Sequence, residues 1–379
     1  MKKLILTMLF LALALPVQAT TLKIATVTPE GSQWMKDMRA SAKEIKERTD
    51  GRVQIKYYGG GVMGNDSKVL GKIRIGALQG GLAGLAFFVV GIPSGVTEVE
   101  KRANGKVLVN TFPGGTLLDA KNMMDGVIAG QADIGCLSMA YQPGRFVVTN
   151  ATSLPLGIPN ATVGSLVLWD LYQKYQPEEF AKVKVLTMFT TAPTNIMSKV
   201  PVRTLDDIKG LDLRASGGAA KILAAWGANP VGMPMPATVE ALQKGVVKGL
   251  FSSLEVMKDF KFAETCKYVT MTDTVIYPFA VVMNMDSWNK LPEDVQQVMD
   301  DLRVEQSEWT GTYMDNLVKA AMEWAKTEQN VEVITLSAEE KAKWDAKLAP
   351  LTEKWVVNAK SKGFAADAIV NDIKALIKK

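Results

Sequence analysis

The sequence predicts an α/β protein of two lobes that ends in long helices, and three observations support this. Short apolar runs typical of strands alternate with helical patterns over most of the chain, which favours mainly parallel sheets. The pattern changes at Pro292, after which long helical segments follow one another. The chain has 379 residues, more than an ordinary domain holds, so two lobes are the expected arrangement.

The individual elements follow from short β-type runs and from apolar residues at helical spacing. Strands are expected at residues 22–26, 53–58, 106–112, 132–138, 183–189, 212–215, 249–252 and 268–272. Helices are expected at residues 66–77, 117–128, 293–328, 337–362 and 365–377. Gly363 lies between the last two helices, where glycine is a common C-cap.

The composition excludes several classes of protein before any motif is considered. Apolar residues make up 47% and charged residues 22% of the chain, which excludes a disordered or fibrous protein. The absence of histidine excludes Ser-His-Asp and Cys-His catalytic groups and every histidine-containing zinc site. Cys136 and Cys266 are too few for a four-cysteine metal site, and nothing in the sequence fixes their distance in space. No metal or other cofactor is therefore expected.

The N-terminus predicts export to the periplasm. Lys2 and Lys3 precede the apolar residues 4–15, and Val17-Gln18-Ala19 resembles a signal-peptidase site. Residues 1–19 are therefore interpreted as a signal peptide that is cleaved after Ala19. The apolar run is shorter than the ~20 residues of a membrane span. Losing the two lysines would lower the net charge from +5 to +3, too weakly basic to suggest nucleic-acid binding.

One helix–strand–turn–helix unit occurs twice in the chain. Residues 45–81 return as residues 99–135 at a constant offset of 54 positions (99 − 45). The identical pairs include Arg48/Arg102, Gly51/Gly105, Val53/Val107, Gly60/Gly114, Gly61/Gly115, Gly76/Gly130 and Gly81/Gly135. Two copies are too few for a solenoid, which needs at least three repeats.

A glycine-rich turn in the first copy raises the possibility of nucleotide binding. Gly59-Gly60-Gly61-Val62-Met63-Gly64 fits the pattern G-x-G-x-x-G, but no acidic residue follows about 20 positions later. The equivalent turn of the second copy, Pro113-Gly114-Gly115-Thr116-Leu117-Leu118, does not keep the pattern. A tight turn is the preferred interpretation. An exported oxidoreductase remains an alternative, which bound nucleotide in the purified protein would support.

Seven segments of the chain match motifs of a known family, and they occur in the same order as in that family: residues 100–115, 130–135, 153–156, 203–214, 226–231, 241–249 and 283–296. The most specific is Arg203-Thr-Leu-Asp-Asp-Ile-Lys-Gly-Leu-Asp-Leu-Arg214. Together they resemble the periplasmic solute-binding subunits of tripartite ATP-independent periplasmic (TRAP) transporters. The resemblance implies a two-lobe, type II-like periplasmic binding protein with crossing hinge strands. Such a protein captures a small organic acid between its lobes, closes on it and delivers it to membrane permease subunits, with no enzymatic chemistry.

With this resemblance, domain boundaries can be predicted. Residues 20–150 and 276–310 are expected to form lobe I, residues 151–275 lobe II, and residues 311–379 the C-terminal bracing helices.

The duplicated unit departs from the family, which carries it once. Tandem duplication, fusion of two related genes or an assembly artefact would each produce it. Because the copy 99–135 runs directly into Cys136, we expect it to occupy the family position, with residues 45–98 as an appended unit.

The resemblance also implies ligand-binding residues. Arg214 ends a G-L-x-x-R strand, where the family's arginine pairs with the substrate carboxylate; a guanidinium offers two parallel donors to such a group. The alternative is an ordinary surface salt bridge. Met235 falls where the family often lines the pocket, and Ser252 falls where an asparagine commonly contacts the ligand.

Three more residues complete the expected site. Thr194 stands where the family often has a second arginine. The loss of that arginine argues against a sialic-acid-like or simple dicarboxylate ligand and leaves room for a monocarboxylate with an apolar body. Arg145 could supply a second cation, although an arginine beside a turn is more often structural. Trp34 follows the turn after the first strand and either faces the cleft or packs in the core. An exported sensor domain would need the same cleft, and neighbouring permease genes would distinguish it from a transport protein.

Overall fold

The computed structural model describes residues 20–26, 43, 46–47, 53–58, 80–82, 102 and 117–378. The chain divides into two compact units, residues 1–84 and residues 85–379. Trp34, residues 1–19, the predicted helix at 66–77 and the predicted strand at 106–112 lie outside the described residues. Within the part of the chain that is described, no helix is long and apolar enough to cross a membrane.

The first unit contains a small parallel sheet. Its strands are β1 (Thr20–Thr26), β2 (Val53–Tyr58) and β3 (Gly80–Leu82), in the order β2-β1-β3. Thr20 of β1 lies opposite Val53 of β2, and Ile24 lies opposite Gly80 of β3. The predicted strands at 22–26 and 53–58 are thereby confirmed.

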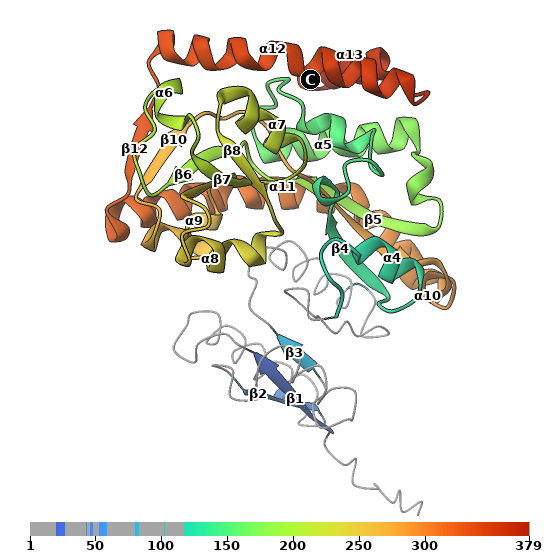
Figure 1. Cartoon of the computed structure of the whole chain (residues 1–379). Helices are drawn as coiled ribbons and strands as arrows, with labels where there is room; N and C mark the ends of the chain where they lie inside the picture. The colour runs from blue at the N-terminus through green and yellow to red at the C-terminus, as the bar shows by residue number, and fades with distance from the viewer. Residues whose placement is uncertain are drawn as a thin grey trace, which may run out of the picture. The chain divides into compact units, whose positions relative to one another are not determined.

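The second unit has a mixed six-stranded sheet in the order β12-β10-β6-β9-β7-β8 (Figure 1). In chain order, its strands are β6 (Asn195–Ser198), β7 (Asp212–Ala215), β8 (Asn229–Gly232), β9 (Gly249–Ser252), β10 (Tyr268–Met271) and β12 (Glu332–Thr335). The central strand β9 runs parallel to β7 and antiparallel to β6.

A three-stranded sheet of the second unit is antiparallel throughout. The strand β11 (Pro278–Asn284) lies between β4 (Ile134–Ser138) and β5 (Val183–Thr190). The expectation of mainly parallel sheets is wrong for this sheet, because β11 enters it from the opposite direction. All seven residues of β11 are buried, so its sequence lacks the alternation that identifies a half-exposed strand.

Two chain segments cross between these sheets side by side. Residues 191–194 join β5 to β6, and residues 272–277 join β10 to β11. The Thr194 amide donates to the Val275 carbonyl at 2.7 Å, and the Thr191 amide donates to the Tyr277 carbonyl at 3.0 Å. The crossing strands implied by the family resemblance are therefore present.

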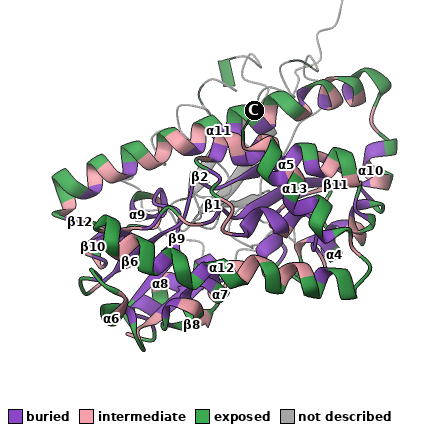
Figure 2. Cartoon of the chain, turned by 90° about the horizontal axis from the view of Figure 1, so that it is seen from above, coloured by how far each residue is buried: buried purple, intermediate pink, exposed green. Residues whose placement is uncertain are grey.

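Helices pack on both sheets of the second unit. They are α4 (Met123–Ile128), α5 (Ala161–Tyr175), α6 (Leu205–Ile208), α7 (Gly217–Trp226), α8 (Met235–Gln243), α9 (Val256–Asp259), α10 (Met285–Asn289), α11 (Glu293–Gln329), α12 (Ala338–Ser361) and α13 (Ala366–Leu376). The long helix α11 contacts α5 and β5 on one side of the crossing and α9 on the other. Exposed and buried residues alternate along it, as expected for a helix with one face on the core (Figure 2).

Close approach of α11 to α5 depends on a glycine. A Cβ atom at Gly311 would lie 2.6 Å from the Cα atom of Thr162 and 2.8 Å from the Ala161 carbonyl oxygen. Asp315, one turn further along α11, accepts hydrogen bonds from the Ala161 and Thr162 amides at 2.8 and 3.0 Å. Since these amides start α5, the carboxylate caps that helix and ties it to α11.

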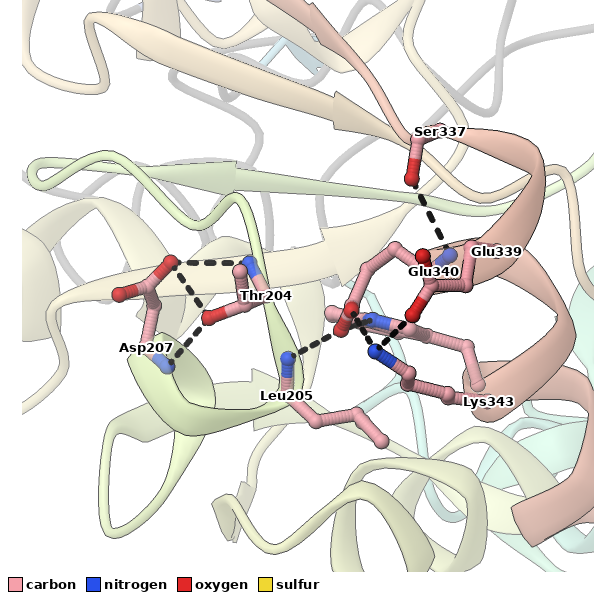
Figure 3. Close-up of polar contacts among 8 residues, drawn as sticks. Thr204, Leu205, Asp207, Ser337, Glu339, Glu340 and Lys343 are labelled. Atoms are coloured by element: carbon pink, nitrogen blue, oxygen red, sulfur yellow. Dashed lines mark hydrogen bonds and ion pairs between the residues drawn. The ribbon is translucent and has the colours of Figure 1, made fainter.

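The C-terminal helix α12 is anchored by its first turns. Ser337 caps the helix by accepting from the Glu340 amide, and the Glu340 carboxylate accepts from the Leu205 amide of α6 at 2.8 Å (Figure 3). Trp344 then packs edge-on against Trp226 of α7, with ring centroids 4.6 Å apart. The helix α12 contacts α7, and α13 contacts α5. Together α12 and α13 therefore touch parts of the unit on both sides of the crossing.

Candidate functional site

Arg214 lies on β7, which is next to the edge strand β8 of the six-stranded sheet. The strand pairs Arg214 with Val231 of β8 and Leu250 of β9. Only 1% of the residue is exposed. Burying a guanidinium without a partner is costly, so its surroundings decide what it can do.

The guanidinium is held by a carbonyl and a phenol. Its Nε and Nη2 atoms donate to the Met233 carbonyl at 3.0 and 2.9 Å, and Nη2 lies 3.5 Å from the Tyr141 hydroxyl. Among the described residues no aspartate or glutamate forms an ion pair with Arg214, whereas Arg145, Arg203 and Arg303 each form one. These neutral contacts orient the cation and leave its charge uncompensated within the described part of the chain.

The Tyr141 hydroxyl also joins Arg214 to Met235. It accepts from the Met235 amide at 3.0 Å, at the start of α8. Met235 is 4% exposed. The structure therefore brings together two of the residues that the sequence selects, and does so through a tyrosine that the sequence analysis did not select.

A second tyrosine stands beside the same arginine. Tyr277 lies on the crossing segment, and its hydroxyl donates to the Phe251 carbonyl at 3.2 Å. Burial raises the pKa of this phenol, while the positive charge of Arg214 acts in the opposite direction. Tyr277 also interacts with Ser216, the residue that precedes α7. The phenol is therefore neutral at physiological pH and offers a polar edge next to the cation.

Ser252 and Thr194 lie at neighbouring strand ends. Ser252 ends β9 opposite Asn195 of β6, and Thr194 immediately precedes Asn195. The Thr194 hydroxyl accepts from the Val275 amide at 3.3 Å, so it is engaged in the crossing. In the described residues, no hydrogen bond involves the Ser252 hydroxyl, although the residue is 1% exposed.

Arg145 and Trp34 are not joined to this group by any described contact. Arg145 forms an ion pair with Asp125 of α4 at 2.6 Å and stacks over Phe146, 5.6 Å from the ring centroid. This geometry favours the structural role for Arg145 that the sequence analysis weighed against ligand binding. Trp34 lies outside the described residues.

A buried carboxyl group lies three residues beyond Ser252. Glu255 is fully buried; Ser253 donates to its Oε2 atom, and its Oε1 atom has no partner among the described residues. Burial raises the pKa of Glu255 to about 8, and the negative charges of Asp259 and Asp315 act in the same direction. The group is therefore largely protonated at neutral pH.

The described residues offer no metal or disulfide site. No group of three or more histidine, cysteine, aspartate or glutamate side chains among them could hold a metal ion. Cys136 and Cys266 are both free, and burial raises the pKa of each thiol to about 12. A surface hollow of about 430 Å³ lies at the C-terminal end of α5, where it is lined by residues such as Tyr175 and Glu179 and by none of the residues selected above.

Comparison with known proteins gives this arrangement a context. Residues 24–91 and 96–358 match the family model described as bacterial extracellular solute-binding protein, family 7. The C4-dicarboxylate-binding protein DctB of Bacillus subtilis is 25% identical over 275 residues, which are 68% of this chain and 75% of that protein. The C4-dicarboxylate-binding periplasmic protein DctP of Rhodobacter capsulatus is 26% identical, over 67% of this chain and 78% of its own.

Solved structures show the same fold. A TRAP periplasmic solute-binding protein from Desulfovibrio salexigens is 45% identical with a TM-score of 0.62, covering 94% of this chain and 95% of its own; it is an open complex with the C-terminus of a symmetry mate in its ligand-binding site. A TRAP solute-binding protein from Rhodoferax ferrireducens, with copurified benzoate, is 22% identical with a TM-score of 0.68, covering 95% of this chain and 98% of its own.

Proposed function

Because the chain belongs to family 7 of the bacterial extracellular solute-binding proteins, we propose that it captures a small organic acid and hands it to the membrane subunits of a TRAP transporter. The family consists of binding proteins, and the chain has no histidine with which to build the usual acyl-transfer groups. Its work is therefore recognition and release. No observation on the described residues favours either of the alternative functions, an exported sensor domain or an oxidoreductase.

The buried, uncompensated Arg214 carries this proposal. A guanidinium at 1% exposure whose described partners are a carbonyl and a phenol lacks the counter-charge that stabilises a buried ion. A ligand carboxylate would supply this charge and accept two parallel hydrogen bonds from the remaining donors. The Met233 and Tyr141 contacts would then fix the direction in which those donors point.

The ligand we propose is a monocarboxylate with an apolar body. The Met235 amide binds the Tyr141 hydroxyl beside Arg214, and the Met235 side chain belongs to an apolar cluster. Thr194 cannot provide the second cation that a dicarboxylate would need. Arg145 is already paired with Asp125. The benzoate that copurified with the Rhodoferax ferrireducens relative makes aromatic acids a reasonable part of a ligand panel.

The two lobes would meet at the crossing segments. The strand β5 pairs with β11, so we propose that lobe I extends to about the crossing at residues 191–194 rather than ending at residue 150. Lobe II would then run from there to the second crossing at residues 272–277, and α12 would brace both. The signal peptide would direct the chain to the periplasm and would be cleaved after Ala19.

Thermal denaturation of residues 20–379 against a panel of organic acids tests the proposal. A ligand that binds only the folded state stabilises it by about 2.7 kcal/mol at a hundred times its dissociation constant. We expect one class of monocarboxylate to raise the melting temperature of the wild type and to have no effect on Arg214→Ala.

The matched control is Arg203→Ala. Arg203 is exposed and forms an ion pair with Glu332, so its loss should leave the ligand-induced shift unchanged. A shift that survives in Arg214→Ala would remove the arginine from the site. A shift produced by a nucleotide and by no acid would favour the oxidoreductase.

A further inference from the structure

The two copies of the repeat end in corresponding strands that have different partners. At the offset of 54 positions, Gly80–Leu82 corresponds to residues 134–136. The first of these segments is β3, which pairs in parallel with β1; the second begins β4, which pairs antiparallel with β11. The copies are therefore similar in sequence and occupy different structural positions, which raises the question of whether either could replace the other.

The helix of the second copy is fitted closely to its surroundings. Met124 is 1% exposed and Val127 is fully buried in an apolar cluster that includes Leu118. A Cβ atom on Gly126 would lie 2.4 Å from the Leu118 Cδ2 atom, so a larger residue at this position would require the Leu118 side chain to move. The corresponding residue of the first copy is Lys72.

The first copy does not compensate fully for that difference. It has Gly64 where the second copy has Leu118, which would relieve the steric contact. A lysine at the buried position of Gly126 would nevertheless place an ammonium group against apolar side chains, with a large desolvation cost. Charge, and not size alone, therefore separates the two copies.

Polar contacts at the end of the second copy point the same way. The Asp133 carboxylate accepts from the Ser287 hydroxyl at 2.5 Å, and its carbonyl accepts from the Asn284 amide at 2.8 Å. Asn284 in turn donates from Nδ2 to the Val127 carbonyl at 2.9 Å. The first copy has Gln79 in place of Asp133, an amide that cannot supply the same anionic acceptor.

We infer that residues 99–135 are the copy on which the fold of the second unit depends, and that the first copy cannot take their place. We further infer that residues 45–98 can be removed without loss of folding. Because the deletion equals the repeat offset, the shortened chain retains counterparts of β2 and β3, at residues 107–112 and 134–136, at unchanged spacing from β1.

Two deletions of equal length test this inference. One joins Glu44 to Val99 and removes residues 45–98; the other joins Gly81 to Cys136 and removes residues 82–135. We expect the first variant to unfold cooperatively within about 4 °C of the intact chain, and the second to lose the cooperative transition. Cooperative melting of both variants alike, or of the second alone, would overturn the inference.

The intact chain provides an independent test should neither shortened chain fold. Two substitutions introduce the same charge at equivalent positions: Val127→Asp in the second copy, and its counterpart Ile73→Asp in the first copy. We expect Val127→Asp to abolish or strongly lower the melting transition, and Ile73→Asp to change the melting temperature by less than about 4 °C. Equal losses, or a larger loss from Ile73→Asp, would show that the fold depends on the first copy as well. Neither test uses a ligand, so the result is independent of the proposed function.

Discussion

At the scale of single residues, the candidate site is organised by Arg214 and by the hydroxyl of Tyr141. That hydroxyl accepts from the Met235 amide at 3.0 Å and lies 3.5 Å from Arg214 Nη2. It thus connects the start of α8 to the cation, and a change at Tyr141 should be felt in ligand affinity as well as in stability.

We predict that Tyr141→Phe weakens the binding of the carboxylate and lowers stability. The substitution leaves the Met235 amide without its acceptor, at a cost of about 1–3 kcal/mol, and frees the guanidinium to turn. Tyr175→Phe is the matched control, because its hydroxyl donates at 2.6 Å to Asp372, away from Arg214. Calorimetric titration should show weaker binding for Tyr141→Phe alone. Equal affinities for the two variants would contradict this role.

Glu255 predicts a pH dependence of stability. Its pKa is raised from 4.5 to about 8 in the folded chain, so the folded state keeps a proton that the unfolded state has lost. Stability should therefore fall as pH rises from 4.5 towards 8, by about 1.4 kcal/mol for each pH unit, and level off above that. Asp259, whose pKa is raised to about 6, adds to the fall at the acidic end.

Glu255→Gln should remove most of this dependence, because an amide of the same shape does not titrate. Urea unfolding of the ligand-free protein at several pH values between 5 and 8 measures the slope. Glu240→Gln serves as the control, since that carboxylate is on the surface and paired with Lys244. A slope in Glu255→Gln that equals the wild-type slope would show that Glu255 is ionised in the folded protein.

The sequence identifies part of this site and misses the rest for a physical reason. Arg214 and Met235 were selected through the family motif, and the structure brings them together. Tyr141 and Tyr277 were missed because a tyrosine in a loop has no spacing that separates ligand contact from core packing. Tyr141 stands in the short run that drew attention to Arg145, and of these two residues it is Tyr141 that lies next to Arg214.

At the scale of elements, the C-terminal helix α12 depends on Trp344. This residue is 1% exposed, packs against Trp226, and accepts from the Trp226 indole at 3.2 Å through its carbonyl. An edge-to-face pair of this kind contributes beyond the area that it buries. The indole of Trp344 also donates to Glu340 at 3.0 Å, which links the packing to the hydrogen bonds at the start of the helix.

We predict that Trp344→Ala destabilises the protein by about 3–5 kcal/mol, the usual cost of emptying a buried aromatic site. Trp309→Ala on α11 is the matched control, because Trp309 is 40% exposed and stacks only on Tyr313 among the rings described. Its effect on urea unfolding should be much smaller. Similar losses for both variants would mean that α12 is not fixed through this contact.

The three C-terminal helices were all predicted, whereas the strands were predicted only in part: β7 and β9 have the expected bounds, and others were not expected. The expected helix at 293–328 is α11, Glu293–Gln329, because helical periodicity accumulates over many turns. The strands β3, β6, β8, β11 and β12 were not among those expected. Three of them, β6, β8 and β12, have four residues each, and β8 contains Pro230. Segments this short have little local preference, and they become strands through the partners that the sheet provides.

At the scale of the whole chain, two features matter for function. The crossing segments at 191–194 and 272–277 hold each other by backbone hydrogen bonds, which is the arrangement expected of a hinge that bends as one piece. The repeat adds a second copy of one unit. The duplication can be recognised in the sequence, but its effect on the fold cannot. The strand partners of the two copies and the contacts of Gly126 and Asp133 distinguish them.

The central claim is that the chain recognises a carboxylate through Arg214. The most direct measurement is a calorimetric titration of residues 20–379 with the acid that most raises the melting temperature, and with its uncharged primary amide. We predict that the wild type binds the acid at least about tenfold more tightly than the amide, since a charge-assisted hydrogen bond contributes about 1.5–3 kcal/mol, and that Arg214→Ala loses this preference. Equal binding of acid and amide by the wild type, or an unchanged preference in Arg214→Ala, would contradict the account.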